Sequence, residues 1–233
     1  MFKGLRRCRR AWLVNTTGGI ELAEKATLQA VKKALEKAKK RNFKETVDLS
    51  INLKDIDLSV PKNRIQDDII LPYGRGRSVR VCVIGGSELA QKARTVADRV
   101  VTPEELATIA DDKKEAKKVA AQFDYFIAEA PLMPTIGKRL GIVLAPRGKM
   151  PKPIPPGADP RSMIENLRKT VTVRSRDKRT FHTAVGSTDM PVEQIAENVD
   201  SIIKRVASKM ERGMMNIASV YVKTTMGPSE RVK

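Results

Sequence analysis

The sequence predicts an α/β fold of the α+β kind, built as two domains of which one interrupts the other. Strand-like and helix-like patterns alternate along the chain. The strands change from a half-buried to a fully apolar type at Val79 and change back after Pro160, and stretches rich in Pro and Gly lie at both changes. Because an insertion leaves its host and returns to it, we expect two adjacent linkers.

The host domain is expected to be discontinuous, formed by residues 20–75 and 160–233, and the insertion to cover residues 76–159. The order of host elements fits a split-βαβ sandwich, and the insertion is expected to be a Rossmann-like three-layer α/β domain. Residues 1–19 hold four arginines and form a basic N-terminal extension, either an arm that contacts RNA or a loose terminus.

The host domain begins with a helix from about Ile20 to Ala38, because apolar residues recur there every three or four positions. Val47–Leu53 alternates apolar and polar residues, which is the period of a half-buried strand. Ile69–Leu71 indicates a further short strand before the first linker.

The insertion opens with Val79–Ile84, an apolar run typical of a strand buried on both faces. Gly85 and Gly86 follow, and a helix pattern continues through Val96. This order suggests either a phosphate-cradling loop or a tight strand-to-helix turn. The glycine spacing of nucleotide-binding loops is missing, which favours the turn.

Further along the insertion, Thr102 is predicted to cap a helix that has Pro103 at its first position. Another helix is expected over residues 112–121. Asp124–Ala128 and Ile142–Ala145 are predicted to be buried strands, and residues 146–160 a loop.

The host pattern then returns. Val171–Ser175 and Phe181–Val185 are predicted strands joined by a turn at residues 177–178. Val192–Met210 carries an apolar stripe at helical spacing, and Ile217–Thr225 closes the domain as a strand.

The net charge of the 233-residue chain is +18, from 45 Lys and Arg against 27 Asp and Glu, and its pI is about 10.1. This range indicates a polyanionic partner, nucleic acid above all. Aromatic residues make up only 4%, so recognition by stacking on an aromatic platform is not expected. No apolar run approaches the roughly 18 residues of a membrane span, and we expect no membrane partner.

Candidate catalytic and metal-ligating residues are few. Cys8, Cys82 and His182 cannot form a zinc site by spacing, and two cysteines predict no disulfide framework. His182 lacks a visible nucleophile or orienting partner. We therefore expect no metal, no cofactor and no enzymatic activity. The alternative is a nucleotide-binding RNA-modifying enzyme, suggested by the α/β insertion alone.

Two segments carry a resemblance to a known family: Leu144–Pro151, with the sequence LAPRGKMP, and Ser219–Ser229, with the sequence SVYVKTTMGPS. Both resemble the ribosomal protein L1 family, and the likeness extends over the chain from about Ile20. Ala145 and Lys149 resemble the archaeal branch. The family implies the two-domain fold described above.

The resemblance implies a core contact with rRNA made by Ser219, Thr225, Met226, Gly227 and Pro228, together with Phe43 and Thr46. The residues themselves add candidates on or beside the strands of the host domain. Arg174, Lys178 and Lys223 are cations that could neutralise phosphates, and His182 could contact RNA.

By the same resemblance, the chain is expected to be a structural constituent of the large ribosomal subunit in the cytoplasm. It would bind large-subunit rRNA at the mobile stalk and assist release of exit-site tRNA. It would also repress translation of its own mRNA through a similar RNA shape.

Overall fold

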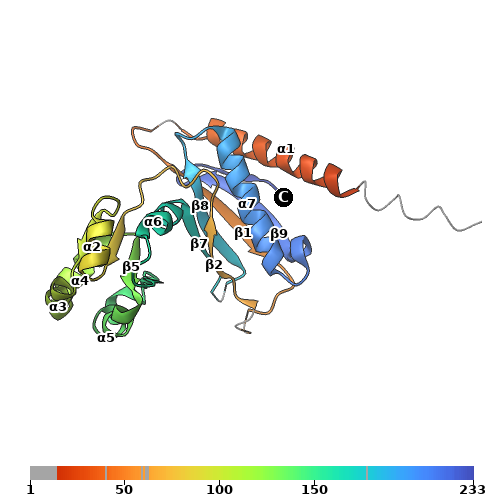
Figure 1. Cartoon of the computed structure of the whole chain (residues 1–233). Coiled ribbons are helices and arrows are strands. Elements are labelled where there is room, and N and C mark those ends of the chain that lie inside the picture. Colours follow the sequence, from red (N-terminus) through yellow and green to blue (C-terminus); the bar gives the residue numbers. More distant parts are fainter. Residues whose placement is uncertain (1–14, 40, 59, 61–62, 177) are drawn as a thin grey trace, which may run out of the picture. The chain divides into compact units, whose positions relative to one another are not determined.

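The computed structural model describes residues 15–39, 41–58, 60, 63–176 and 178–233 (Figure 1). The chain forms two compact units, the first made of the part up to Gly76 together with Val171–Lys233, and the second of Arg77–Thr170. The predicted fold class, a mixed α/β chain of two domains, is confirmed. Of the predicted extension, residues 1–14 lie outside the described residues, whereas residues 15–19 belong to the first helix.

The first unit is built on an antiparallel four-stranded sheet with the order β10-β9-β1-β8. Its strands are β1 (Thr46–Leu53), β8 (Thr180–Ser187), β9 (Ile217–Thr224) and β10 (Ser229–Arg231). A second sheet pairs β2 (Gln66–Ile70) with β7 (Thr170–Arg174). The short 3-10 helix η3 (Gly213–Asn216) leads into β9.

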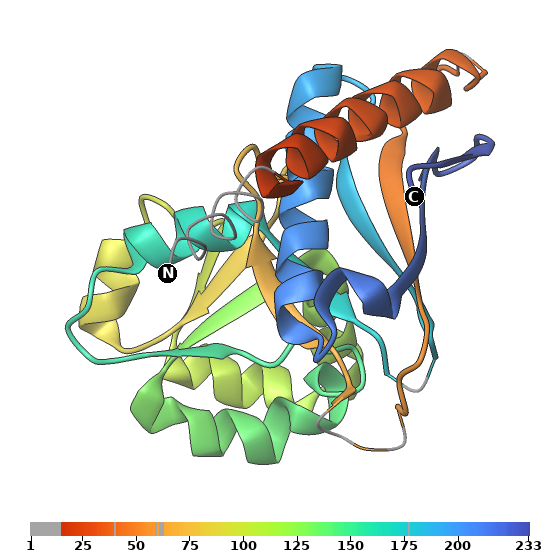
Figure 2. The same cartoon turned by 90° about the vertical axis from the view of Figure 1, so that its right-hand side faces the viewer.

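Helices α1 (Asn15–Glu36) and α7 (Val192–Lys209) pack on one face of the four-stranded sheet, and α1 crosses α7 (Figure 2). The inward side chains of the strands form one core with these helices, including the fully buried Leu49, Ile51 and Val222. Alternate residues of β1 are buried and half-buried, so the polar positions point to the face that the helices leave free.

The chain first leaves the first unit after Gly76, and Asn198 of α7 holds the backbone just before that point, at Tyr73 and Gly74. This side chain is 0% exposed. Its Nδ2 donates to the carbonyls of Gly74, at 2.8 Å, and Val185, at 2.9 Å, and its Oδ1 accepts from the N–H of Tyr73 at 3.3 Å. A buried polar side chain in the apolar stripe of α7 is therefore fully used in fixing the loop before Gly76.

The second unit contains a parallel sheet with the order β4-β3-β5-β6. These strands are β3 (Val81–Ile84), β4 (Arg99–Val101), β5 (Tyr125–Glu129) and β6 (Lys152–Ile154). One face packs against α2 (Ser87–Ala93) and α6 (Pro160–Lys169), and the other against α3 (Pro103–Asp111), α4 (Lys113–Gln122) and α5 (Met133–Leu144), which follows the 3-10 helix η2 (Ala130–Leu132). Every side chain of β3 is buried, since both faces are covered.

Three expectations for the second unit are corrected. Ile142–Ala145 does not form a strand but ends α5, whose buried Ile136, Leu140 and Leu144 recur every four residues while Ile142 is 77% exposed. The supposed loop after it contains β6, an edge strand in which a proline is tolerated. The chain returns to the first unit at Val171 rather than at Pro160, because Ile164 and Leu167 of α6 pack into the core of the second unit.

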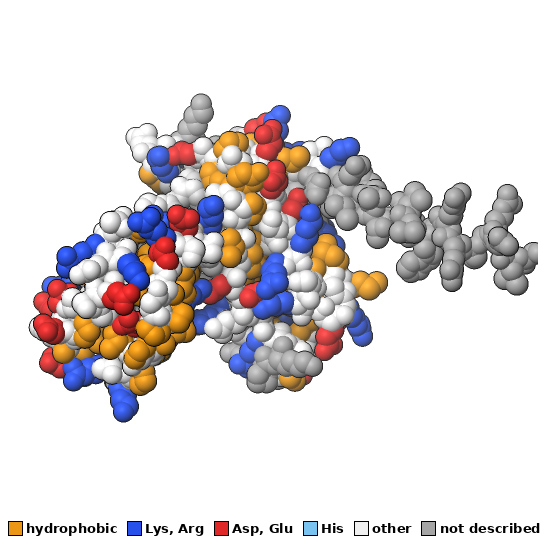
Figure 3. All heavy atoms as spheres, in the orientation of Figure 1, with side chains coloured by type: hydrophobic (Ala, Val, Ile, Leu, Met, Phe, Trp, Pro, Cys, Tyr) orange, Lys and Arg blue, Asp and Glu red, His pale blue; other side chains and the backbone are white. Residues whose placement is uncertain are grey.

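Acidic and basic side chains are interspersed over both units in the view of Figure 3. None of the described helices combines the length and the apolarity that a bilayer-crossing segment requires.

We expect Asn198→Leu to lower the free energy of unfolding by about 2–4 kcal/mol, because it leaves buried carbonyls unpaired at roughly 1–3 kcal/mol each. Urea denaturation followed by circular dichroism measures the change. Gln194→Leu, which replaces a half-buried polar side chain on the same helix, is the control and should stay within about 0.5 kcal/mol of the original chain. Equal stability of the two variants would contradict the role of Asn198.

Candidate nucleic-acid interface

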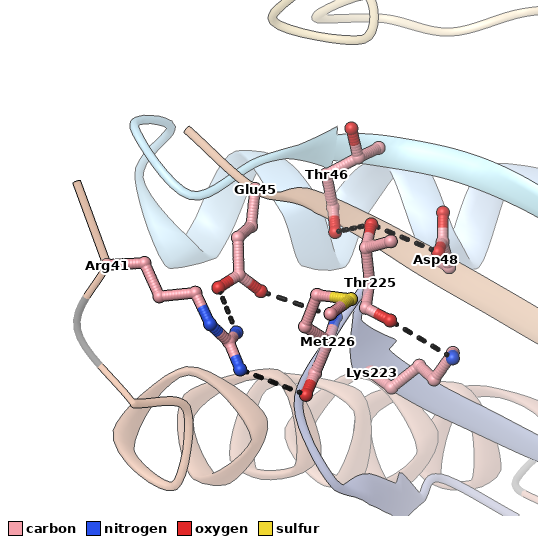
Figure 4. A network of polar contacts seen from close by, with 7 residues as sticks. All are labelled: Arg41, Glu45, Thr46, Asp48, Lys223, Thr225 and Met226. Atoms are coloured by element: carbon pink, nitrogen blue, oxygen red, sulfur yellow. Dashed lines mark hydrogen bonds and ion pairs between the residues drawn. The ribbon is translucent and has the colours of Figure 1, made fainter. Parts of the chain in front are cut away.

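The pairing of β1 with β9 brings the segment that holds Phe43 and Thr46 to the end of the Ser219–Ser229 motif. Val47 lies opposite Thr224 in the sheet. Just beyond that pair, the N–H of Thr225 donates to the carbonyl of Thr46 at 2.9 Å, and the Thr225 hydroxyl donates to the same oxygen at 3.0 Å (Figure 4). Residues far apart in the sequence thus form one continuous site at this end of the sheet.

We call residues 225–228, which leave β9, the strand-exit loop. Glu45, whose side chain is only 4% exposed, holds it from one side. Its carboxylate forms an ion pair with Arg41 and accepts from the N–H of Met226 at 3.4 Å, while Arg41 donates to the Met226 carbonyl at 3.4 Å. The backbone of Met226 is therefore held between a cation and an anion (Figure 4).

This arrangement changes the acidity of Glu45. The hydrogen bond from Arg41 lowers the pKa of the Glu45 carboxyl below its ordinary value, against the opposing effect of burial, and the N–H of Met226 adds to the lowering. A charged carboxylate is thereby maintained beneath the strand-exit loop.

Gly227 explains why the loop can turn so tightly. Its N–H donates to the carbonyl of Thr224 at 3.0 Å, and a Cβ at this position would lie 2.2 Å from the Thr224 hydroxyl. Only glycine fits without displacing Thr224, so Gly227 has a structural role whatever the loop binds. The side chain of Met226 is 64% exposed, and Pro228 is exposed as well.

The face of the four-stranded sheet opposite α1 and α7 carries a continuous polar surface, here called the open face. No described helix of the first unit covers it. Cross-strand rows follow from the register. The rows are Ala184–Asp48–Lys223–Ser229, His182–Ser50–Tyr221–Arg231 and Thr180–Asn52–Ser219. Hydroxyls, an amide, an imidazole and cations therefore line one side of the sheet.

The predicted site residues divide into two groups along this sheet. Phe43, Thr46, Lys223 and the strand-exit loop lie at the start of β1. Ser219 lies at the other end, where its hydroxyl accepts from Asn52 at 2.7 Å. With 8 residues, β1 separates the two ends by roughly 25 Å.

The remaining predicted residues lie toward the far end. His182 is exposed in the middle row of the open face, and Lys178 is exposed in the turn that precedes β8. Arg174 is half-buried at the end of β7. Asp177, named with Lys178 as the turn, lies outside the described residues. These cations are therefore separate from the strand-exit loop.

Sequence reasoning passed over several residues of the interface. The alternating pattern of β1 identifies Ser50 and Asn52 as outward polar positions, and it is the only sequence signal that points to them. No sequence pattern points to Arg41 and Glu45, because their ion pair is relevant to the site only through its contacts with the backbone of Met226, a residue far away in the sequence.

The LAPRGKMP segment has an internal role in the second unit. Lys149 donates to the carbonyls of Ala120, at 3.0 Å, and Phe123, at 2.6 Å, at the end of α4. Arg147 donates to the carbonyl of Lys117 at 3.2 Å. The two Lys149 contacts satisfy carbonyls at the C-terminus of α4, where the last carbonyls of a helix lack intrahelical partners. The segment follows a helix rather than the strand expected from the sequence.

The groups gathered at the candidate interface are donors and acceptors suited to binding. Among the described residues, no three His, Cys, Asp or Glu side chains gather where they could share a metal ion. Hydroxyls and exposed backbone at a strand exit suit phosphate and ribose 2′-OH groups.

Comparison with known proteins agrees with these features. Residues 34–228 match the model of the ribosomal protein L1p/L10e family. A large ribosomal subunit protein uL1 from Methanocella arvoryzae is 53% identical over 212 residues, which cover 91% of this chain and 100% of the relative. The uL1 proteins of Thermoplasma acidophilum and Haloferax volcanii are 52% and 49% identical over 205 residues, covering 88% of this chain and 94% and 97% of the relatives. The resemblance expected from the two motifs is confirmed.

The lowered pKa of Glu45 predicts a pH dependence of stability. A carboxyl whose pKa is lower in the folded state than in the unfolded state stabilises the fold at pH values above its ordinary pKa of 4.5. This contribution is lost as the pH falls through the folded-state pKa. Glu45→Gln should remove this component, so that the unfolding free energies of the two proteins differ most near about pH 7 and converge toward about pH 3.

Urea denaturation across this pH range measures the effect. Glu36→Gln, an exposed position on α1, is the control and should run parallel to the original chain. A constant difference between the Glu45 variant and the original chain at every pH would show that the carboxylate charge does not matter.

Proposed function

The chain belongs to the ribosomal protein L1p/L10e family, and on this premise we propose that it is a structural component of the large ribosomal subunit that binds large-subunit rRNA at the mobile stalk. Its relatives carry the name large ribosomal subunit protein uL1. The observation that carries the proposal is the junction of Thr46 with the strand-exit loop, which joins the two groups of residues that the family resemblance assigns to RNA contact, at the start of β1 and after β9.

The proposed mode of binding is recognition of RNA shape. The strand-exit loop offers the exposed hydroxyl of Thr225, exposed backbone and the side chain of Met226. The open face adds Ser219, Lys223 and His182. Such groups suit phosphates and 2′-OH groups rather than a long code of bases. The net charge of +18 supplies attraction to the RNA backbone.

The alternative, a nucleotide-binding RNA-modifying enzyme, is disfavoured by the turn after β3. The N–H of Gly86 donates to the carboxylate of Glu129 at 2.9 Å. An anion from the protein itself therefore occupies the start of α2, where a phosphate would have to bind. The expectation that the chain is not an enzyme is confirmed by its membership of a family of ribosomal proteins.

We test rRNA binding with two substitutions of Thr225. Thr225→Val removes the hydroxyl, which also donates to Thr46, and should weaken binding of a stalk rRNA fragment by about 1–3 kcal/mol without changing the salt dependence. Thr225→Ser keeps the hydroxyl and should bind nearly as the original chain does. Filter binding at several salt concentrations gives both quantities. Equal affinity of all three proteins would remove Thr225 from the interface.

The same binding measurements at several salt concentrations show which cations contact phosphate. If the side chain of Lys223 or Arg174 neutralises a phosphate, its change to Ala should reduce the slope of log affinity against log salt by about 0.7–0.9. Lys223 lies on the open face beside the strand-exit loop and Arg174 lies at the end of β7, so unequal slopes would show which of the two places meets the RNA backbone.

We further propose that the chain assists release of deacylated tRNA from the exit site. The support is family membership, together with a two-unit fold linked by two crossings. Ribosomes assembled without the protein should release exit-site tRNA at an altered rate, and adding the protein back should restore the rate. An unchanged release rate would restrict the role to rRNA binding.

A last part of the proposal is repression of the chain's own mRNA, since an mRNA can imitate a compact rRNA shape more easily than a long base sequence. Repression only at protein excess requires weaker binding to mRNA, and a tenfold difference corresponds to about 1.4 kcal/mol. Excess protein should inhibit translation of its own mRNA, and stalk rRNA should relieve the block. Translation that is insensitive to the protein would contradict autoregulation.

A further inference from the structure

A hollow of about 340 Å³ opens in the first unit directly beside the strand-exit loop. Leu35 of α1 and Ala38, two residues beyond the end of that helix, form its apolar part, and Phe43 and Thr188 also line it. Lys39 and the Arg41–Glu45 ion pair complete the lining.

The hollow and the strand-exit loop share their walls. Arg41 and Glu45, which line the hollow, hold the backbone of Met226. Ala38, also in the lining, lies so close to the loop that its Cβ would be 3.7 Å from a Cβ at Gly227. A ligand bound to the loop therefore has this hollow immediately beside it.

The lining is unusual for a protein surface. Phe43 is 59% exposed, and it is one of the 5 phenylalanines in the chain. An exposed aromatic side chain therefore stands at this hollow. It lines the hollow together with the apolar Leu35 and Ala38 and with two cations, Lys39 and Arg41. A flat aromatic surface with cationic donors at its edge suits a heterocyclic base, which has a π face for stacking and carbonyl or ring-nitrogen acceptors on its edge.

We propose that this hollow receives one unpaired base from the RNA bound at the strand-exit loop. The base stacks on Phe43, its sugar and phosphate remain over the exposed loop, and Lys39 or Arg41 donates to its edge. The inference rests on the proposed RNA binding and adds to it a contact with a single base, next to the shape recognition by the loop.

Two other hollows of similar size in the first unit do not suit an RNA base. One, of about 400 Å³, has among its described lining residues three acidic side chains, Glu193, Glu197 and Asp200, against the single cation Lys204, and this excess of negative charge repels a phosphate backbone. The other, of about 300 Å³, has three acidic side chains, Asp55, Asp57 and Glu211, against two basic ones, Lys209 and Arg212, in the described part of its wall, and it follows the far end of β1, away from the strand-exit loop. Of the residues that the structure describes, the hollow beside Phe43 has two basic side chains, Lys39 and Arg41, against the single acid Glu45, and it lies beside the strand-exit loop.

The test compares variants of the full chain binding a stalk rRNA fragment. Thr188→Trp fills the hollow from its wall without removing the hydrogen bond between its backbone N–H and the carbonyl of Glu45. Phe43→Ala removes the stacking surface at an exposed position, where unfolding is not expected. Ser208→Trp adds the same bulk at an exposed position of α7 and serves as the control.

Two measurements are combined: the dissociation constant at several salt concentrations, and the reactivity of each base toward chemical probes of its edge. We expect one unpaired base to be protected by the original chain and by Ser208→Trp. Thr188→Trp and Phe43→Ala should lose that protection and bind about 5- to 150-fold more weakly, with an unchanged salt slope.

The outcomes distinguish the inference from the proposed function. If the original chain fails to bind the rRNA fragment, both are overturned. If it binds and Thr188→Trp and Phe43→Ala bind equally well with the same bases protected, RNA binding stands and the base site is wrong. A reduced salt slope in Phe43→Ala, without loss of a protected base, would also overturn the base site.

Discussion

The first unit depends on the position of β1 between β8 and β9. Its residues Val47–Leu53 pair with Ile217–Thr224 on one side, and Thr46–Asn52 with Thr180–Ser187 on the other. Both partners come from the part of the chain that follows the second unit, so the host sheet cannot form until the chain returns. The same pairing orders the polar rows of the open face and places the strand-exit loop at Thr46.

Polar contacts of the buried Glu45, the partly buried Arg41 and the exposed Thr225 fix the backbone at this end of the sheet. Glu45 and Arg41 hold a short loop whose own residues bury little, and Thr225 adds two bonds to one carbonyl. Because each group is satisfied within the protein, the loop has a defined shape before any ligand arrives, which reduces the ordering cost of binding. The exposed Phe43 and Met226 are presented on this fixed frame.

Sequence patterns succeeded where one period dominated. The alternation of Val47–Leu53 correctly predicted a strand, and the apolar stripe of Val192–Met210 correctly predicted a helix. Each element buries one face against a single core, so its apolar residues recur with one regular period. Helix α5 was missed because the apolar run at its end, Ile142–Ala145, looks like a buried strand when read alone. Helix α6 follows a proline-rich stretch that suggests a linker, yet Ile164 and Leu167 join it to the second unit.

The sequence by itself determined the charge, the fold class, the two motifs and the family they resemble, because these depend on composition and short spacings. Only the tertiary structure decided that Glu45 lies beneath Met226, that Gly227 has no room for a side chain, and that Ser219 and Thr225 stand at opposite ends of one sheet face. Such facts arise from contacts between distant parts of the chain, and no local period encodes the distance between two residues that meet only after folding.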